Sequence, residues 1–272
     1  MAQNVELMNL FWSSAGIYPV GTGISPFAFE ARVRSAAKAG FKAVEIGNPY
    51  EAPAAEMAAR LKSNGLTLAL FNTTAGDGAA GERGRGALAG REKDFDADIA
   101  NALSYSEATG CKLLHVMAGL VHQGARRETF VANLRKAART AAKSGVDLVI
   151  EPINRRDIPG YFLNKLAEAR AIIYEVGEPN LGLQFDLYHS QIMGGDLTHR
   201  LRQFGSLIRH VQIAGAPLRN EPDRGEVNYG YLFDLIDELG YTGWIGCEYR
   251  PSGGTEDGLE WLRTWRQGRH IA

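Results

Sequence analysis

Four oxygen-bearing side chains recur through the second half of the chain. Each stands at the end of an apolar run: Glu151 in "LVIEP", Asp186 in "LQFDL", Gln212 in "HVQIAG" and Glu248 in "IGCEY". The intervals between them are 35, 26 and 36 residues, about one strand-plus-helix unit each. Three carboxylates and one amide oxygen suit a hard divalent cation, Mg²⁺ or Mn²⁺, better than zinc, which favours nitrogen and sulfur. The pattern predicts a metal site formed by these four side chains.

Asp186 shows why such a site needs a partner. It follows the apolar run Leu181 to Phe185, and an isolated ionised carboxylate is costly to remove from water. A cation would neutralise it, whereas three carboxylates without a cation would repel one another and raise one another's pKa. A single acidic residue at a strand end is more commonly a helix N-cap or a salt-bridge partner, and that interpretation stays open for each residue alone. Four in register favour a shared site.

Three polar residues follow these strand ends in the sequence. His189 could polarise a substrate carbonyl or orient a ligand, or it could simply bond backbone at a helix start. Asp157, in "EPINRRDIPGYF", could bond His189 or the substrate. Arg219, in "GAPLRNEPDRGE", could clamp a substrate carboxylate or hydroxyl in bidentate fashion, or lie at the surface.

Two more polar residues and one glycine bear on the same region. Glu45 ends a run in "AVEIGNPY"; it could contact substrate or stabilise the turn at Asn48-Pro49. His210 shares the phase of Gln212 one layer deeper, which favours a core or supporting role. Gly246 shares the inward phase of Glu248, so a side chain there would compete for space beneath the site.

Short apolar runs alternate with longer helical patterns along the whole chain. Strands are predicted at about 6–12, 41–46, 66–71, 111–117, 147–151, 181–186, 208–213 and 243–248. Helices are predicted near 27–39, 53–64, 93–109, 127–144, 163–175, 190–203, 229–239 and 256–268. In the fourth helix, Phe130, Leu134, Ala137, Ala138 and Ala141 fall on one face, and Gly145 acts as the stop.

Eight strand-then-helix units in 272 residues predict an α/β fold, a closed (β/α)₈ TIM barrel forming a single domain over residues 1–272. The alternative is an open doubly-wound sheet. It is disfavoured because "SSAGIYPVGTGISP" does not run directly into a helix as a phosphate-binding glycine motif does. In a barrel the active site lies at the carboxyl ends of the strands, so the four strand-end residues should converge at one side of its mouth.

Residues 72–92, "NTTAGDGAAGERGRGALAGRE", interrupt this rhythm with a glycine-rich stretch. A phosphate-cradling loop is disfavoured because the Gly-Lys-Ser/Thr ending is absent. A lid over the barrel mouth and an ordinary surface loop both remain open.

Composition narrows the classes of partner and location. The formal net charge is −1, which argues against a nucleic-acid or membrane-surface protein. No apolar run approaches the ~20 residues that span a bilayer, and "MAQNVELMNLFW" lacks the features of a signal peptide. The only cysteines, Cys111 and Cys247, fall in predicted strands, so we expect buried thiols and a cytoplasmic location. Trp261 and Trp265 are either interface residues of a homo-oligomer or packed on the barrel wall.

The strand-end residues resemble those of the xylose isomerase-like barrel family of sugar phosphate isomerases and epimerases, and most of all its hydroxypyruvate isomerase branch. The stretches that carry the resemblance are "AGDGAAGERG", "GREKDF", "LHVMAG", "IEPINRRDIPGYFL", "QFDLYH", "HVQIAGAPLRNEP", "GEVNYGYLF" and "GWIGCEYRP". They cover most of residues 72 to 250. The region "MNLFWSSAGIYPVGTGISPF" is longer than that branch leads one to expect, and it would shape the substrate side of the mouth.

The resemblance implies that Glu151, Asp186, Gln212 and Glu248 bind one divalent metal, and that the two glutamates are proton donor and acceptor. His189 and Arg219 match the family's substrate-binding histidine and arginine. The implied reaction is isomerisation of a short α-hydroxycarbonyl compound through an enediolate, with hydroxypyruvate giving tartronate semialdehyde. If the substrate is a short oxo acid, Arg219 would hold its carboxylate.

Several rival functions share part of this pattern. A 2-oxo-tetronate isomerase or a ketose 3-epimerase would use the same metal site. A phosphodiesterase or endonuclease would need more histidine ligands and a basic cleft, and the near-zero net charge argues against it. A non-catalytic sugar-binding barrel would bind ligand without exchanging a proton from substrate carbon.

Overall fold

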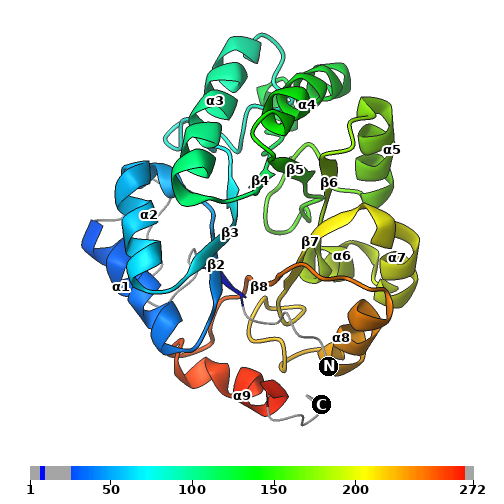
Figure 1. The fold of residues 1–272 in the computed structure, drawn as a ribbon. Coiled ribbons are helices and arrows are strands. Elements are labelled where there is room, and N and C mark those ends of the chain that lie inside the picture. Colours follow the sequence, from blue (N-terminus) through cyan, green and yellow to red (C-terminus); the bar gives the residue numbers. More distant parts are fainter. Residues whose placement is uncertain (1–6, 10–25, 267–272) are drawn as a thin grey trace.

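The computed structural model describes residues 7–9 and 26–266, and in it eight parallel strands close into a barrel (Figure 1). The strands are β1 (Leu7–Asn9), β2 (Ala43–Ile46), β3 (Thr67–Asn72), β4 (Leu113–His115), β5 (Asp147–Ile150), β6 (Leu181–Asp186), β7 (Ile208–Ile213) and β8 (Ile245–Cys247). Each pairs with its neighbours in chain order, and β1 pairs with β8 to close the ring. The predicted (β/α)₈ barrel is confirmed.

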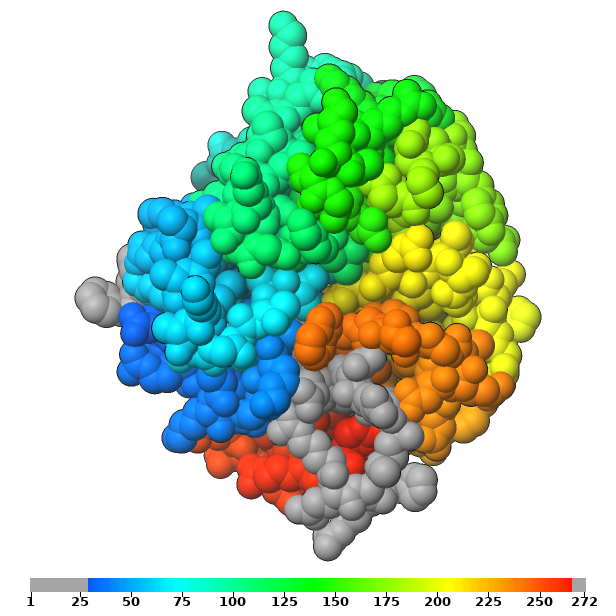
Figure 2. All heavy atoms as spheres, viewed as in Figure 1, coloured from blue at the N-terminus to red at the C-terminus, as the bar shows by residue number. Residues whose placement is uncertain are grey.

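The helices form an outer ring around these strands (Figure 1). In the described part of the chain they are α1 (Pro26–Lys38), α2 (Ala54–Ser63), α3 (Glu92–Thr109), α4 (Arg127–Ala142), α5 (Leu166–Val176), α6 (Leu187–Gly194), α7 (Leu197–Phe204), α8 (Tyr229–Glu238) and α9 (Glu260–Arg266). Colours in the space-filling view follow one another around the molecule, so consecutive units are spatial neighbours (Figure 2). This order brings the ends of strands β5 to β8 together on one side of the barrel.

Helix α4 shows how the sequence pattern forms this wall. The five residues of its predicted apolar face are all buried, and the helix ends three residues before Gly145, whose φ of 61° suits glycine. Trp261 is also buried, with its indole N–H 3.3 Å from the Tyr249 hydroxyl, and Trp265 packs against Phe233. Of the two interpretations of these tryptophans, packing on the barrel wall is the one the structure shows.

The predicted helix at 190–203 is wrong as a single element. The structure has two helices there, α6 and α7, because Gly195 and Asp196 both adopt positive φ, 62° and 54°. Such backbone cannot continue a right-handed helix. Helix α6 also begins earlier than expected, with Asp186 as its N-cap.

Residues 72–92 are linked internally by a buried acidic residue, Glu82, and are joined to the chain after β4 by two β-bridges. Glu82 accepts hydrogen bonds from the backbone N–H of Asp77 and from the side chains of Arg85 and Arg91. Single β-bridges join Gly84 to Ala118 and Leu88 to Ala125. These contacts hold the segment against the chain that follows β4.

Both cysteines are buried free thiols, although Cys111 lies two residues before β4 and not within it. The predicted first strand, 6–12, lies partly outside the described residues, as do the long segment before α1 and the end of the last predicted helix. Within the described residues, no helix combines the length and the apolar character that crossing a membrane requires.

Candidate active site

The four strand-end residues lie at the carboxyl ends of β5 to β8, as the barrel prediction requires. Glu151 follows β5 directly, Asp186 ends β6, and Glu248 follows β8 directly. Gln212 pairs in register with Asp186 on one side and with Gly246 on the other. All four therefore lie at the carboxyl end of the barrel, where strands β5 to β8 meet the following loops, with Glu248 two residues beyond the register partner of Gln212.

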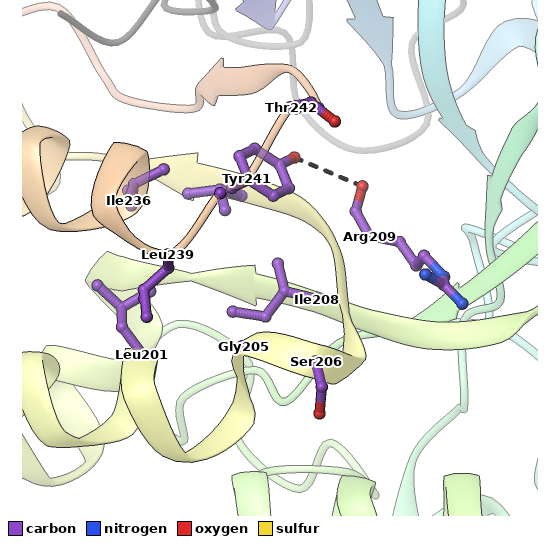
Figure 3. A pocket seen from close by; sticks show the side chains of 12 residues that line it. Leu201, Gly205, Ser206, Ile208, Arg209, Ile236, Leu239, Tyr241 and Thr242 are labelled. Atoms are coloured by element: carbon purple, nitrogen blue, oxygen red, sulfur yellow. Dashed lines mark hydrogen bonds between the residues drawn. The ribbon is translucent and has the colours of Figure 1, made fainter.

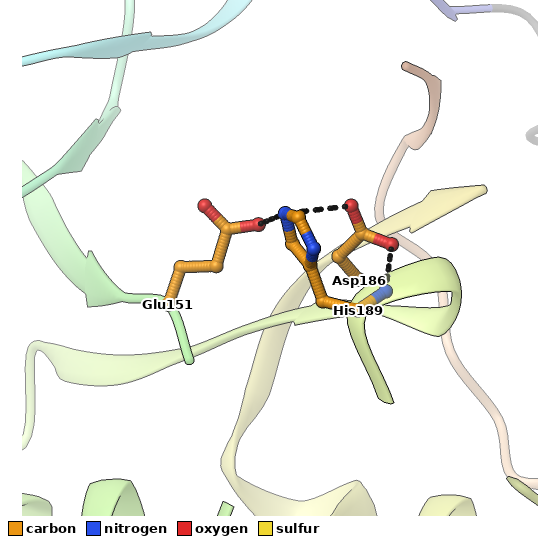
Figure 4. Close-up of side chains that lie close together, drawn as sticks. All are labelled: Glu151, Asp186 and His189. Atoms are coloured by element: carbon orange, nitrogen blue, oxygen red, sulfur yellow. Dashed lines mark hydrogen bonds and ion pairs between the residues drawn. The ribbon is translucent and has the colours of Figure 1, made fainter. Parts of the chain in front are cut away.

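Glu151, Asp186 and His189 form a buried cluster that could hold a metal ion (Figure 4). One ligand atom from each lies within 4.8 Å of the other two. His189 Nε2 is 3.7 Å from Glu151 Oε1 and 3.6 Å from Asp186 Oδ2. Those two carboxylate oxygens are buried and have no hydrogen-bond partner among the described residues. Oxygens of this kind need a cation or a donor, so this pair suits the predicted hard cation.

Asp186 is both the N-cap of a helix and a member of the carboxylate cluster. Its Oδ1 caps helix α6 by accepting hydrogen bonds from the backbone N–H of Tyr188 (2.6 Å) and of His189 (3.1 Å). Its Oδ2 faces the cluster. The N-cap fixes the carboxylate, and the second oxygen remains available to the site.

Gln212 lies at the centre of a buried hydrogen-bond network. Its Nε2 donates to Glu248 Oε2 (2.7 Å) and to Glu45 Oε1 (3.0 Å), while its Oε1 accepts from Gln184 Nε2 (2.6 Å). The amide oxygen would have to exchange Gln184 for the metal in order to act as a ligand. In the structure, Gln212 is therefore linked to the site mainly by the hydrogen bond that its Nε2 donates to Glu248.

Glu45 lies beneath this network, 1 % exposed. Besides Gln212 it binds His210, whose Nε2 is 2.7 Å from Glu45 Oε2. The Glu45 carboxylate thus binds two residues of β7, while the Asn48 side chain in the following turn donates to Glu51. The supporting position predicted for His210 is confirmed.

Arg219 is buried in the site and not at the surface. Its Nη1 is 2.8 Å from Asp157 Oδ2, and its Nη2 is 3.0 Å from Glu248 Oε1 and 3.7 Å from Asp186 Oδ2. The guanidinium also stacks over the Tyr188 ring at 5.1 Å. Burial alone would lower the pKa of Arg219, but the carboxylates around it raise the pKa, so the side chain carries a permanent positive charge.

Of the two partners considered for Asp157, His189 and the substrate, the structure does not join it to His189. Asp157 accepts from the Tyr188 hydroxyl (3.1 Å) and from Arg219. His189 Nδ1 instead lies 2.6 Å from Asn154 Nδ2.

Asn154 and His115 are two buried site residues that the sequence reasoning missed. His115 ends β4, with Nδ1 3.1 Å from Asn72 Oδ1 and 3.9 Å from Glu151 Oε2. Extending the strand-end rule from β5 back to β4 would have found His115 in "LLHV". Asn154 lies in a loop, where no periodic pattern marks it.

Burial and mutual repulsion set the protonation of the carboxylates. Burial raises the pKa of Glu151 well above its usual range, and the charges of Glu248 and Asp186 add to the effect. Burial also raises the pKa of Asp186 to about 6, against the lowering effect of Arg219 and two backbone N–H groups. The repulsion expected of neighbouring carboxylates is thus present, and Glu151 retains a proton more readily than a free glutamate.

The buried histidines respond to burial in the opposite direction. Burial lowers the pKa of His115 to about 3 and holds the pKa of His189 well below its usual range. Both rings are therefore neutral near pH 7.

A separate cavity of about 340 Å³ lies at the other end of the barrel (Figure 3). Its walls include Ile208 and Arg209 at the start of β7 and Tyr241 and Gly243 before β8. The start of β7, the turn before β8 and residues of α7 and α8 form it, so it is not part of the carboxylate cluster.

Comparison with known proteins agrees with this geometry. Residues 33–265 match the model of the family described as xylose isomerase-like TIM barrel. The chain is 54% identical over 242 residues to a 2-oxo-tetronate isomerase of Cupriavidus necator. The aligned residues make up 88% of this chain and 93% of that protein. It is 43% identical over 244 residues to the hydroxypyruvate isomerase of Escherichia coli. The aligned residues make up 88% of this chain and 95% of that protein.

Solved structures give the same result for the fold. A Brucella melitensis protein described as an AP endonuclease of family 2 superposes with a TM-score of 0.88 at 43% identity, covering 95% of this chain and 98% of that one. The family match and the relatives above lead to one conclusion: the chain belongs to the xylose isomerase-like TIM barrel family, and it is an isomerase.

Proposed function

We propose that the protein isomerises a short α-hydroxycarbonyl acid through an enediolate, with hydroxypyruvate converted to tartronate semialdehyde. The observation that carries this proposal is the placement of Glu151 and Glu248 at the carboxyl ends of β5 and β8, on either side of Asp186 and Gln212 in the strand order. A proton moves from the carbon that bears the hydroxyl group to the neighbouring carbonyl carbon, and the hydroxyl proton passes to the former carbonyl oxygen. This gives the isomer, and no other reactant is consumed. Two carboxylates on different strands suit such a transfer.

We propose Mg²⁺ or Mn²⁺ as the cofactor, held by Glu151, Asp186, Gln212 and Glu248. The buried oxygens of Glu151 and Asp186 that lack a hydrogen-bond partner among the described residues support this. When bound, the cation would polarise the substrate carbonyl and acidify the adjacent C–H. Gln212 would take part only after a change in its hydrogen bond to Gln184.

The two glutamates have different surroundings, which fits different roles in proton transfer. Burial raises the pKa of Glu151 in the metal-free protein, and a bound cation would oppose that rise. Glu248 accepts from Gln212 and pairs with Arg219, two contacts that stabilise its ionised form. We assign Glu248 as the carboxylate that first removes the proton and Glu151 as the group that delivers one.

Arg219 is the proposed binding group for the substrate carboxylate. Asp157 and the Tyr188 ring hold its guanidinium in place at the mouth. A fixed guanidinium binds a carboxylate in bidentate fashion, as a short oxo acid requires. Glu45 lies below Gln212 and is assigned to support of that residue, out of direct reach of the substrate.

A four-carbon 2-oxo acid is the second candidate substrate, with the carbonyl moved in the same way. The specific observation in its favour is the 54% identity to the Cupriavidus necator 2-oxo-tetronate isomerase, against 43% to the Escherichia coli hydroxypyruvate isomerase. A ketose 3-epimerase would return the proton to the opposite face of the same carbon. The buried free thiols of Cys111 and Cys247 are compatible with the cytoplasm, where we place the enzyme.

Proton NMR in D₂O distinguishes these reactions. Metal-stripped protein, reloaded with Mg²⁺ or Mn²⁺, is incubated separately with hydroxypyruvate, with a 2-oxo-tetronate and with fructose. Metal-dependent deuterium incorporation at C3 of hydroxypyruvate, with tartronate semialdehyde appearing, is the expected result. Turnover of the tetronate alone would select the second candidate, and exchange in fructose alone would select the epimerase. Binding without exchange in all three tubes would overturn the proposed isomerisation of these compounds.

A further inference from the structure

Asn154 has a side-chain orientation that its own loop fixes. Its Oδ1 accepts two backbone hydrogen bonds, from Arg156 N–H at 2.9 Å and from Asp157 N–H at 2.8 Å. The amide NH₂ could not replace the oxygen there, because two donors would face two donors. Asn154 is completely buried, so water does not offer an alternative arrangement. The nitrogen of this amide must therefore point the other way.

That nitrogen faces the ring of His189. Asn154 Nδ2 lies 2.6 Å from His189 Nδ1, and an amide nitrogen only donates. His189 Nδ1 must then accept, which means that it carries no proton. In a neutral imidazole the proton is then on Nε2, and a doubly protonated ring would place two donors against each other. The lowered pKa of His189, caused by burial first and by Arg219 next, agrees with a neutral ring.

The protonated Nε2 faces the cluster. It lies between the unpartnered oxygens of Glu151 and Asp186, at 3.7 and 3.6 Å. A ring nitrogen that carries a proton has no lone pair for a metal ion. It can donate to a carboxylate or to an oxygen that enters the space between them.

We infer that Asn154 is a positioning residue that holds His189 in the Nε2–H form, so that His189 serves the site as a hydrogen-bond donor and not as a metal ligand. The inference rests on the proposed function only for the identity of the acceptor, a substrate oxygen on which negative charge develops. It narrows the three-residue cluster to two metal-binding carboxylates and one donor. A donor directed at developing charge stabilises it without reorganisation.

The form of the ring can be measured without turnover. Long-range ¹H–¹⁵N NMR on metal-free protein labelled at histidine nitrogens separates the two neutral tautomers and the imidazolium, with His189→Gln providing the assignment. The expected spectrum for His189 shows protonated Nε2 and unprotonated Nδ1 at pH 7. Protonated Nδ1 in the wild-type protein would overturn the inference while leaving the proposed isomerisation intact.

Asn154→Asp tests whether Asn154 determines the tautomer of His189. The aspartate keeps an oxygen for the two backbone N–H groups and presents a second oxygen to Nδ1, so the proton should move to Nδ1. We expect kcat to fall about 100-fold, the usual cost of one lost donor, with KM changed much less. An unchanged tautomer, or an unchanged kcat with the tautomer switched, would each overturn the role assigned to Asn154.

Asn164→Asp is the matched control, because Asn164 lies in the same loop and bonds Tyr161 O and Arg155, away from His189. It should leave both the His189 spectrum and kcat unchanged. A separate measurement is the Mn²⁺ affinity of His189→Ala, obtained from a titration monitored by EPR. This affinity should stay within about threefold of wild type. A loss comparable to that of Asp186→Asn would show that His189 is a ligand and would overturn the inference. If Asn154→Asp does not fold, the wild-type spectrum and this titration still decide it.

Discussion

Gly246 lies directly against the carboxylate of Glu45. An ideal Cβ at Gly246 would sit 2.8 Å from Glu45 Cδ and overlap Oε1. The absence of a side chain at Gly246 therefore leaves room for the Glu45 carboxylate. That carboxylate accepts a hydrogen bond from Gln212, and Gln212 also donates to Glu248. The competition for space beneath the site that the inward phase of Gly246 predicts is thus confirmed, with Glu45 as the residue concerned.

Gly246→Ala should displace Glu45 and break its bond to Gln212. Overpacking of this kind costs about 1–3 kcal/mol of unfolding free energy. We expect kcat to fall as well, because Glu248 loses an oriented partner. Urea unfolding and steady-state kinetics measure the two effects.

Gly205→Ala is the control for that variant. Gly205 has helical φ and ψ, −49° and −42°, and nothing lies within 4 Å of its ideal Cβ. Alanine there should be neutral or stabilising by up to about 1 kcal/mol. Equal effects of the two substitutions would contradict the steric role assigned to Gly246.

Arg219→Lys should reduce activity strongly although the charge is kept. The guanidinium contacts Asp157 and Glu248 at once and stacks on Tyr188, which a single ammonium group cannot reproduce. We expect kcat/KM to fall at least about 100-fold, since a buried carboxylate loses its partner and the substrate loses a bidentate clamp. Kinetics with the substrate identified by NMR give the value.

Arg202→Lys serves as the comparison for Arg219→Lys. Arg202 also makes two contacts to one carboxylate, Glu238, but both side chains are exposed. Exposed pairs contribute little, so stability should change by less than about 0.5 kcal/mol and kinetics should not change. Near-normal activity of the Arg219 variant would rule out the clamp.

The residues that regular periodicity positions were predictable from the sequence. Strand alternation and the eight repeated units are enough to place Glu151, Asp186, Gln212 and Glu248 at one end of the barrel. The same reasoning could have included His115, which ends β4 in the same way.

The hydrogen-bond partners were not predictable, for a physical reason. Glu45 and Gln212 are 167 residues apart, and their contact depends on how the barrel closes. Asn154 acts through a loop turn, and no sequence pattern shows that the two oxygens of Asp186 are divided between a helix N-cap and the cluster. The break before α7 depends on two positive-φ residues, a local choice that a helical pattern does not reveal.

Glu151→Gln and Glu248→Gln should each abolish turnover while leaving the fold intact. Each removes a carboxylate proposed to move a proton, so kcat should fall at least about 1000-fold. Glutamine has nearly the same shape, and at Glu151 it removes a charge that burial already disfavours. Circular dichroism verifies the fold, and deuterium exchange into substrate measures the loss.

Glu175→Gln is the matched substitution away from the site. Glu175 lies on α5 and pairs with Arg127 at the surface, 2.6 Å away. Its activity should equal wild type. Substantial turnover by either active-site variant would remove that glutamate from the proposed proton transfer.

Asp186→Asn should make the metal-free protein more stable at neutral pH. Folding raises the pKa of Asp186 from 3.8 to about 6, chiefly because the group is buried. The folded state then binds more protons than the unfolded state between those two values. The free energy of unfolding contributed by Asp186 therefore falls as pH rises from about 4 to 6, and stays low above that. Asparagine carries no charge and can still accept the N-cap hydrogen bonds.

The stability difference between Asp186→Asn and wild type should thus grow from near zero at pH 4 to on the order of 3 kcal/mol at pH 7, since one pKa unit equals about 1.4 kcal/mol. Denaturant unfolding of both metal-free proteins from pH 4 to 8 measures it. Asp96→Asn, which alters an exposed pair with Lys136, should show no such slope. Adding Mg²⁺ or Mn²⁺ should then stabilise wild type and not the Asp186 variant, because a cation that neutralises Asp186 binds only the folded state. A difference that does not vary with pH, or equal stabilisation of both proteins by metal, would contradict the assignment of Asp186 as a buried, cation-binding carboxylate.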